Sequence, residues 1–287
     1  MGSSPKKGGF APNQTVFLLG NPLDHSLSPA MQNAALHYLG LPWIYAPLEV
    51  ESSRLGQAVG ILRSSNVRGA NVTVPYKEAV FSHLDQVDGK SAWLGSVNTL
   101  YRRGRKIYGT STDGEGFLRS LGALRKSLKD SRGLLLGAGG AAKAVAGAMA
   151  GSGIRQLFIA NRSASRGKQL AGLIRKRHPQ LEVNLVGVRE SEKLLPRMNW
   201  VVQATSLGLR PGDPSPISLK SAASSTWVVD LIYNRPTAFL EGAKNRRLRH
   251  RGGLGMLLHQ GALAFEVWTG RQAPLKVMER VLLENLM

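Results

Sequence analysis

The chain has 287 residues, of which 43% are hydrophobic, and it carries a formal net charge of +20 at pH 7. This length exceeds one ordinary hydrophobic core, so we expect two domains. The absence of cysteine excludes disulfides, thiolate nucleophiles and cysteine-ligated zinc, and it fits a cytoplasmic location. The sequence holds no run of about 18 consecutive apolar residues, so we expect no membrane span and no membrane partner.

The positive charge is spread over several short basic runs, among them 102–106, 175–177 and 244–251. A field of this sign attracts anions of many kinds, nucleic acids and anionic metabolites included. Aromatic interleaving and zinc-finger or helix-turn-helix spacing do not accompany these runs, so we interpret them as solvated faces and expect no specific nucleic-acid partner. Residues 1–11 are mostly small, basic or glycine, and we expect a disordered tail.

The first predicted strand, 15–19, is followed by the loop GNPLDHSLSP and by a helix with an apolar face that ends at Gly40. Ser28 has the position of an N-cap, with Pro29 in the first turn. The hydroxyls of Ser26 and Ser28 also gather at this helix N-terminus, where free N–H groups favour a carboxylate or phosphate. Capping and ligand binding are compatible interpretations.

A strand is predicted at 43–50, a helix at 55–63, and a β-branched strand at 67–74, which Pro75 ends. Lys77 then falls in the first turn of an apolar-periodic helix that runs to Leu84. Strand-to-helix corners line the mouth of an open α/β sheet, so Lys77 is a candidate cleft residue. The alternative is a solvated lysine at a helix start.

Two further strands, 96–101 and 106–110, predict a hairpin around the polar RRGR turn. Asn98 lies in the first of them, and Asp113 lies in the TSTDG turn after the second. An aspartate before glycine often serves only the turn, and this alternative stays open for Asp113.

The second half of the chain alternates helices and strands, which predicts a parallel, doubly wound α/β sheet. A helix at 115–128 precedes it. The predicted strands are 134–136, 157–160, 183–186, 200–204 and 227–232, and the predicted helices are 141–151 and 165–177.

The turn GAGGAA between the first of these strands and its helix has G-x-G-x-x-A spacing. Gly137 allows a tight turn, Gly139 allows close approach of a pyrophosphate, and Ala142 allows the helix to pack on the strand. The turn therefore predicts a dinucleotide site, which Ala138, Gly140 and Ala141 complete.

At the end of the next strand, an NAD site would carry an acidic residue for the ribose. This chain has Asn161, Arg162 and Ser163 there, with Arg166 close behind. Guanidinium groups match a 2′-phosphate, which a carboxylate would repel. The pattern favours NADP over NAD, with surface arginines as the alternative.

After a basic linker, GLGMLLHQGALAFEVWTG predicts a helix whose apolar face is interrupted by Gln260, and a last helix is predicted at 275–286. A buried polar residue needs partners, and a ligand is one possibility. Both helices are expected to pack on the N-terminal domain. We thus expect a tail at 1–11, a substrate-binding domain at 12–113, a Rossmann-type domain at 114–252 and returning helices at 253–287.

The ordered motifs GNPLDHSLSP, NVTVPYKE, SVNTL, TSTDGEGF, GAGGAAKAV, NRS, ATSLG, DLIYNRPT and GMLLHQGALAF resemble the shikimate dehydrogenase family from Val16 to Leu286. The resemblance implies reversible NADP-dependent reduction of 3-dehydroshikimate to shikimate on the route to chorismate and the aromatic amino acids. It implies Lys77 and Asp113 as the catalytic pair. The substrate-binding positions it implies are Ser26, Ser28, Thr73, Asn98, Tyr233 and Gln260. Further cofactor-binding positions it implies are Thr205, Ser206, Gly253 and Met256.

The chemistry of these residues agrees with such a reaction. When a ketone accepts hydride, negative charge develops on its oxygen, and a protonated Lys77 can supply a proton. Asp113 can orient the ammonium, and Ser26 and Ser28 can receive the substrate carboxylate. We expect a small-molecule substrate, no metal, and a monomer or homodimer.

Two positions depart from the family pattern: Gln203 and Ser111 stand where the family often has asparagine. Gln203 adjoins the expected nicotinamide side and could alter cofactor placement. A paralogue acting on quinate or on an amino-substituted analogue would keep every motif above. Two more interpretations stay open: a basic NADP-binding protein without turnover, and one half of a bifunctional enzyme, which no appended segment supports.

Overall fold

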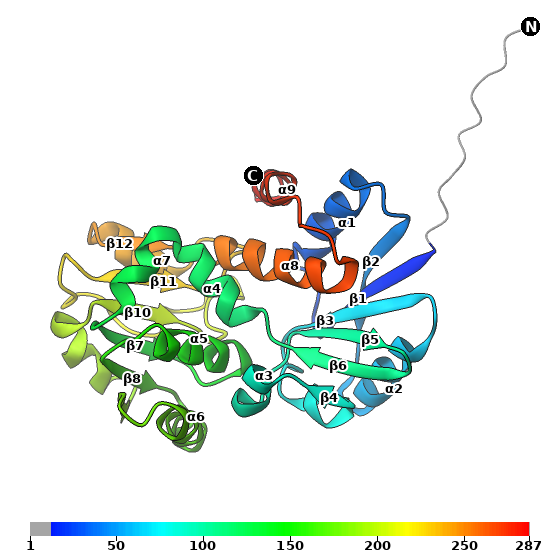
Figure 1. Cartoon of the computed structure of the whole chain (residues 1–287). Helices are drawn as coiled ribbons and strands as arrows, with labels where there is room; N and C mark the ends of the chain where they lie inside the picture. Colours follow the sequence, from blue (N-terminus) through cyan, green and yellow to red (C-terminus); the bar gives the residue numbers. More distant parts are fainter. Residues whose placement is uncertain (1–12, 287) are drawn as a thin grey trace, which may run out of the picture.

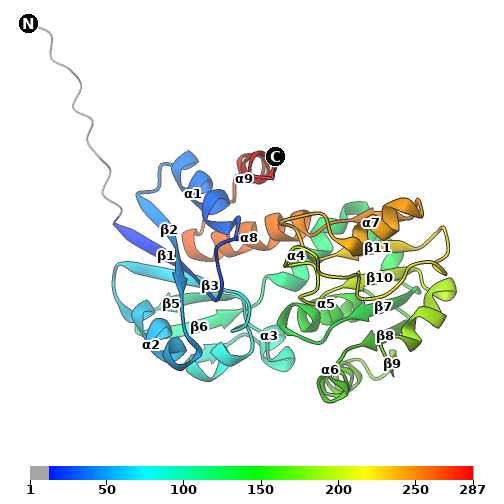
Figure 2. The same ribbon diagram turned by 180° about the vertical axis from the view of Figure 1, so that it is seen from behind.

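The computed structural model describes residues 13–286, so the expected tail at 1–11 lies outside the described residues. Two six-stranded sheets lie next to each other, each with helices against it (Figures 1 and 2). The helix α8 (Leu254–Thr269) runs along the region between them and contacts strands of the first sheet. This arrangement confirms the predicted α/β class.

The first sheet is mixed and has the strand order β2-β1-β3-β5-β6-β4. The strand β1 is parallel to both β2 and β3, whereas β5 is antiparallel to β3 and β6. The strands are β1 (Gln14–Gly20), β2 (Trp43–Glu49), β3 (Val67–Val72), β4 (Gln86–Val87), β5 (Thr99–Arg103) and β6 (Lys106–Thr110).

The second sheet is parallel throughout, in the order β12-β11-β10-β7-β8-β9. The chain moves outward from β7 to β9 and then returns to β10 beside β7, which creates the switch point where ligands bind in such sheets. The strands are β7 (Arg132–Leu136), β8 (Gln156–Ala160), β9 (Glu182–Val186), β10 (Trp200–Gln203), β11 (Trp227–Asp230) and β12 (Arg249–Arg251).

Helices cover both faces of each sheet and bury four apolar clusters. The helices not yet given are α1 (Ser28–Tyr38), α2 (Leu55–Gly60), α3 (Gly89–Leu94), α4 (Asp113–Leu121), α5 (Gly140–Gly151), α6 (Ala164–Arg177), α7 (Ala238–Asn245) and α9 (Leu275–Glu284). The two C-terminal helices share a cluster with α1, β1 and β2, as expected from the sequence. The predicted domain boundaries stay predictions.

Several predicted helices end earlier than expected and continue as 3₁₀ helices. The helix predicted at 55–63 is α2 followed by Ile61–Arg63, and the one predicted at 115–128 is α4 followed by Gly122–Leu128. Gly122 has a positive φ of 58°, which ends α4.

The predicted helix after Lys77 is wrong. The backbone carbonyl of Lys77 accepts from the amide of Val97 at 2.8 Å, so it is not available to an α-helix. Lys77 therefore lies in a turn, and only a 3₁₀ helix follows, at Ala79–His83.

Three local positions also differ. Leu27 occupies the N-cap of α1 and Ser28 is the first residue of the helix, so the predicted cap at Ser28 is wrong. The Ser28 amide donates to the Ser26 hydroxyl at 3.3 Å. Asn98 precedes β5, and Asp113 begins α4 instead of lying in a turn. The prediction also missed β4, α3, α7 and β12, although Asp88 and Thr237 cap α3 and α7 with their side chains.

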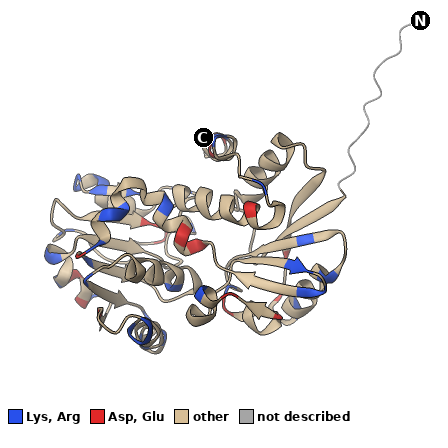
Figure 3. Ribbon diagram, viewed as in Figure 1, with Lys and Arg blue, Asp and Glu red and all other residues tan. Residues whose placement is uncertain are grey.

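The charged residues are distributed over both halves of the molecule. Figure 3 shows Lys and Arg on helices and strands around both sheets, with Asp and Glu between them. Within residues 13–286, no helix combines the length and the apolar composition needed to cross a bilayer.

Candidate active site

A cavity of about 130 Å³ lies between the carboxyl ends of β1 and β3, the N-terminus of α5 and the first turns of α8. Every residue predicted from the family resemblance to act in catalysis or substrate binding lines it: Ser26, Ser28, Thr73, Lys77, Asn98, Asp113, Tyr233 and Gln260. The structure thus gathers residues from distant stretches of the chain around one space.

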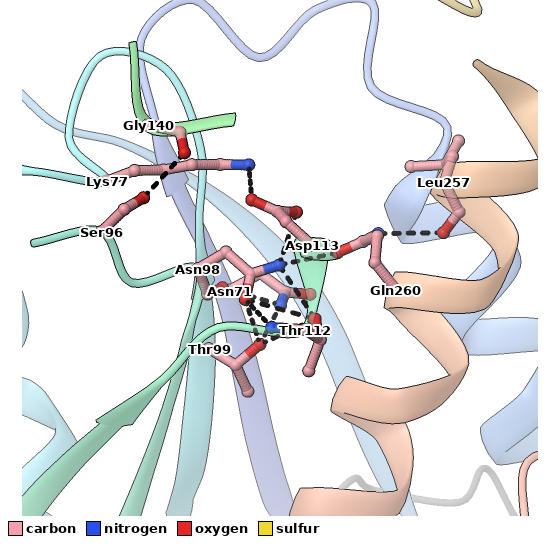
Figure 4. A network of polar contacts seen from close by, with 10 residues as sticks. All are labelled: Asn71, Lys77, Ser96, Asn98, Thr99, Thr112, Asp113, Gly140, Leu257 and Gln260. Atoms are coloured by element: carbon pink, nitrogen blue, oxygen red, sulfur yellow. Dashed lines mark hydrogen bonds and ion pairs between the residues drawn. The ribbon is translucent and has the colours of Figure 1, made fainter. Parts of the chain in front are cut away.

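Lys77 and Asp113 form an ion pair beside this cavity, with Nζ 2.5 Å from Oδ2. Only 15% of the lysine side chain and 3% of the aspartate side chain are exposed. Asp113 is the first residue of α4, where unpaired N–H groups favour a carboxylate. The pair, which Figure 4 shows, therefore places the Lys77 ammonium beside the cavity.

Asn98 links this pair to α8. Its Nδ2 lies 2.9 Å from Asp113 Oδ1, 2.9 Å from Thr112 Oγ1 and 3.0 Å from Gln260 Oε1. An amide nitrogen has only two hydrogens for these three acceptors. Oxygen lone pairs in this network thus remain for the hydroxyl groups of a bound molecule (Figure 4).

Gln260 is oriented by its own helix, because its Nε2 donates to the carbonyl of Leu257 at 2.9 Å. This turns Oε1 toward Asn98 and the cavity. Gln260, the polar residue on the apolar face of α8, is therefore hydrogen-bonded to the protein and also lines the cavity.

Asn71, which the sequence analysis did not assign, also lines the cavity. Its Nδ2 donates to the Asn98 carbonyl at 3.0 Å, and its Oδ1 accepts from the hydroxyl of Tyr45 at 2.9 Å. Burial raises the pKa of Tyr45, and the Ser28 hydroxyl beside it acts in the opposite direction. An asparagine inside an apolar strand was the signal that could have identified Asn71, because a buried amide needs partners.

Ser26, Ser28 and Tyr233 form a hydroxyl-rich wall of the cavity, beside the N-terminus of α1. Burial raises the pKa of the Tyr233 hydroxyl, and hydrogen bonds from Ser26 and the Leu27 amide lower it. The wall thus combines three hydroxyls with the N-terminal end of a helix that has no acidic residue in its first turn. A carboxylate fits this chemistry.

Asp230 anchors the segment that carries Tyr233. Its Oδ1 accepts from the amide of Ile232 at 2.9 Å, and its Oδ2 accepts from the hydroxyl of Thr237 at 2.6 Å. Burial raises the pKa of Asp230 to about 6, and these two hydrogen bonds oppose that shift. The carboxylate closes a loop between β11 and α7.

The glycine turn after β7 fits a dinucleotide. Gly137 has a φ of 117°, and a Cβ there would lie 2.7 Å from the carbonyl oxygen of Ala204. A Cβ on Gly139 would meet nothing within 4 Å, so its backbone faces open space. The N-terminus of α5 has no side-chain cap and no acidic residue in its first turn. It is free to receive a pyrophosphate, together with Ala138 and Ala141.

A second hollow, of about 490 Å³, lies beyond the ends of β8 and β9. Asn161 and Arg162 line it, whereas Ser163 and Arg166 are not among its lining residues. The Ser163 hydroxyl lies 2.9 Å from that of Ser165, and the Arg166 guanidinium pairs with Glu78. Of the four residues predicted for the 2′-phosphate, two thus line this hollow and two do not.

The four remaining predicted cofactor residues lie in two different places. Gly253 and Met256 line the first cavity, with the substrate-binding candidates. Thr205 and Ser206 lie in the loop after β10, outside the linings of both cavities.

The departures from the family pattern have different consequences. Gln203 is fully buried, and its side chain accepts from the Thr205 amide at 2.5 Å and donates to the Leu207 carbonyl at 2.6 Å. It therefore shapes the loop that carries Thr205 and Ser206. Ser111 has a buried hydroxyl oxygen with no partner among the described residues. Nothing in the structure explains the serine at that position.

No group of three or more His, Asp or Glu side chains within residues 13–286 is arranged to hold a metal ion. The polar groups of the site are an ammonium, a carboxylate, amides and hydroxyls. Their chemistry is that of proton donation and hydrogen bonding.

Three sequence families match successive parts of the chain. The "Shikimate dehydrogenase substrate binding domain" matches residues 18–100, "Shikimate / quinate 5-dehydrogenase" matches 121–212, and "Shikimate 5'-dehydrogenase C-terminal domain" matches 253–283. The first match covers most of the first sheet, and the second covers the glycine turn and the NRS segment.

Curated relatives and solved structures match nearly the whole chain. Shikimate dehydrogenase (NADP(+)) of Moorella thermoacetica is 43% identical over 274 residues, 94% of this chain and 93% of that protein. The structure of shikimate 5-dehydrogenase from Thermus thermophilus with NADP(H) and shikimate has a TM-score of 0.84 and 35% identity, covering 95% of this chain and 100% of that one. Quinate dehydrogenase from Corynebacterium glutamicum with NAD has a TM-score of 0.84 at 28% identity, covering 95% and 99%. With a glycine turn, a buried Lys–Asp pair and these similarities along its length, the chain belongs to the shikimate dehydrogenase family.

Proposed function

We propose that the protein is an NADP-dependent shikimate dehydrogenase that reversibly reduces 3-dehydroshikimate to shikimate. The observation that carries this proposal is the single cavity in which the Lys77–Asp113 pair meets the amide and hydroxyl groups of Asn98, Gln260 and Thr73. An ammonium donor beside an acceptor-rich network suits a ring with a ketone and several hydroxyls.

Lys77 is the proposed proton donor. NADPH, when bound, supplies the hydride that reduces the ketone carbon. As negative charge develops on the ketone oxygen, an ammonium hydrogen of Lys77 stabilises it and is transferred to it. In the oxidising direction, Lys77 takes the proton back.

Asp113 orients this ammonium and can accept a hydrogen bond from a neighbouring hydroxyl of the substrate. Its position is fixed by the ion pair with Lys77 and by the hydrogen bond from Asn98. Low exposure of both side chains strengthens their interaction relative to one in water.

The remaining lining residues have binding roles in this proposal. Ser26, Ser28 and Tyr233 hold the substrate carboxylate at the N-terminus of α1, while Thr73, Asn98 and Gln260 bind ring hydroxyls. The glycine turn of 137–141 would hold the pyrophosphate, with Asn161 and Arg162 at the adenosine end and Gly253 and Met256 at the nicotinamide end. The residues that would hold the cofactor come mainly from the second half and those that would bind the substrate mainly from the first, so both halves would contribute to one site.

A matrix of steady-state rates tests the proposal, with shikimate and quinate each assayed with NADP and NAD. We expect the highest kcat/KM for shikimate with NADP. A higher value for quinate would assign the chain to the quinate branch that one structural neighbour represents. Absence of turnover with every pair, despite NADPH binding, would favour a non-catalytic NADP-binding protein.

The cytoplasmic location and the monomeric or homodimeric state expected from the sequence stay predictions. Light scattering of the purified protein measures the second of these directly.

A further inference from the structure

Glu78, next to the catalytic candidate Lys77, sends its carboxylate across the cleft to two cations of the second half. Its Oε2 lies 2.6 Å from Nζ of Lys143 on α5, and its Oε1 lies 2.5 Å from Nη2 of Arg166 on α6. The proposed reaction uses neither ion pair. The Glu78 carboxylate thus joins the turn that carries Lys77 to α5 and α6, the two helices that flank the proposed cofactor site.

The two pairs differ in burial. The side chain of Lys143 is only 13% exposed, whereas that of Arg166 is 53% exposed and that of Glu78 is 34% exposed. Breaking the Lys143 pair would leave a buried ammonium without compensation. Separating the half-exposed Arg166 from Glu78 costs little, because water solvates the freed guanidinium. Of the two cations, Arg166 is therefore the one that can leave Glu78 and bind another anion.

Arg166 follows the NRS segment, and the sequence predicts that it contacts the 2′-phosphate together with that segment. Asn161 and Arg162 line the second hollow, beyond the ends of β8 and β9, but the Arg166 guanidinium pairs with Glu78 instead. The same cation thus has two possible anionic partners, one inside the protein and one on the cofactor.

We propose that Glu78 competes with the cofactor 2′-phosphate for Arg166 and thereby limits how strongly the protein prefers NADP over NAD. The inference rests on the proposed use of NADP. NAD has no 2′-phosphate, so its binding does not depend on this competition. Removing the charge of Glu78 removes this competitor.

The experiment measures dissociation constants for NADPH and NADH by titration of cofactor fluorescence in the wild type, Glu78→Gln, Arg166→Gln and the double variant. For Glu78→Gln we expect a dissociation constant for NADPH that is lower by about two- to fivefold, the range for an exposed ion pair. The constant for NADH should not change. In the Arg166→Gln background, Glu78→Gln should no longer tighten NADPH binding.

Glu284→Gln is the matched control, because Glu284 forms an ion pair with Arg280 on the last helix. It changes the net charge equally and should leave both constants unchanged. Circular dichroism and thermal unfolding verify that Glu78→Gln is folded, and Glu78→Ala is a second neutral variant that should shift NADPH binding in the same direction.

Three results would overturn the inference: an unchanged or weaker affinity of Glu78→Gln for NADPH, equal tightening for both cofactors, or tightening that persists without Arg166. A wild type that binds NADPH no better than NADH would contradict the proposed cofactor itself. That failure is visible without any variant, so the two proposals are tested separately.

Discussion

The Lys77–Asp113 pair is largely buried, and a buried ion pair needs more than its mutual attraction to offset the loss of hydration. Here the additional contributions are the hydrogen bond from Asn98 and the N-terminus of α4 behind the carboxylate. Removing one partner would leave the other charge uncompensated. The functional groups at the centre of the site are therefore also structural groups.

Replacing Lys77 by alanine should lower kcat by about 10²–10⁴, the usual contribution of a positioned proton donor. The dissociation constant for NADPH should change little, because the lysine ammonium pairs with Asp113 and is not among the groups proposed to hold the cofactor. Steady-state rates and NADPH titration measure the two quantities. Lys276→Ala, at an exposed position of α9, is the control. An unchanged kcat would remove Lys77 from the mechanism.

At the scale of elements, the segment between β11 and α7 shows how one residue can hold a functional loop. Asp230 ends β11 and receives hydrogen bonds from Ile232 and Thr237, and the Thr237 hydroxyl accepts in turn from the Leu240 amide as the N-cap of α7. Tyr233 lies inside the closed loop. Its position in the cavity thus depends on a buried carboxylate that does not line the cavity.

The raised pKa of Asp230 predicts a pH dependence of stability. Since its pKa is about 6 in the folded protein and near 3.8 in the unfolded chain, the folded state binds this proton more tightly. The contribution of Asp230 to the free energy of unfolding is therefore complete below pH 3.8 and is lost as the pH rises through 6. Its full size is about 3 kcal/mol.

Asp230→Asn should abolish this contribution. The free energy of unfolding of the wild type, minus that of the variant, should fall by up to about 3 kcal/mol between pH 4 and pH 7. Urea unfolding at several pH values measures it, with the exposed Asp24→Asn as the control. A difference that stays constant over this range would contradict the assignment.

At the scale of the whole molecule, the two halves touch at the N-terminus of α5. A Cβ on Gly140 would lie 2.7 Å from Lys77 Cβ, and the Ser96 hydroxyl donates to the Gly140 carbonyl at 3.0 Å. On the next turns of the same helix, the ring of Trp93 and the side chain of Leu94 approach Gly147. The N-terminus of α5, which would hold the pyrophosphate, thus contacts the turn that carries Lys77.

Gly140→Ala should introduce a steric clash at this contact. Its methyl group would push Lys77 away from the cofactor side, and displacements of this order cost about 10²-fold in rate. We therefore expect a large fall in kcat with a small change in the free energy of unfolding. Gly172→Ala, on α6 with open space around the added methyl group, is the control. Equal kcat values for the two variants would show that the contact does not position the lysine.

The parts of the fold that the sequence predicted are those set by neighbours in the chain. The βαβ alternation and the tight turn at Gly137 were predicted correctly, because hydrophobic period and turn chemistry act within a few residues. The cofactor contacts assigned to the glycine turn and the NRS segment stay predictions. The short elements α3 and β12 were missed, since they offer little periodicity. The helix expected after Lys77 was wrong, because the Lys77 carbonyl bonds to Val97, 20 residues away.

The sequence by itself determined which chemical groups the protein has and at which strand or helix ends they stand. Only the tertiary structure decided which of them meet: Lys77 with Asp113, Asn71 with Tyr45, and Glu78 with Arg166. Local propensities act over one or two turns, whereas these pairs are 36, 26 and 88 residues apart. Their meeting follows from the strand order of the two sheets and from the packing of one half against the other.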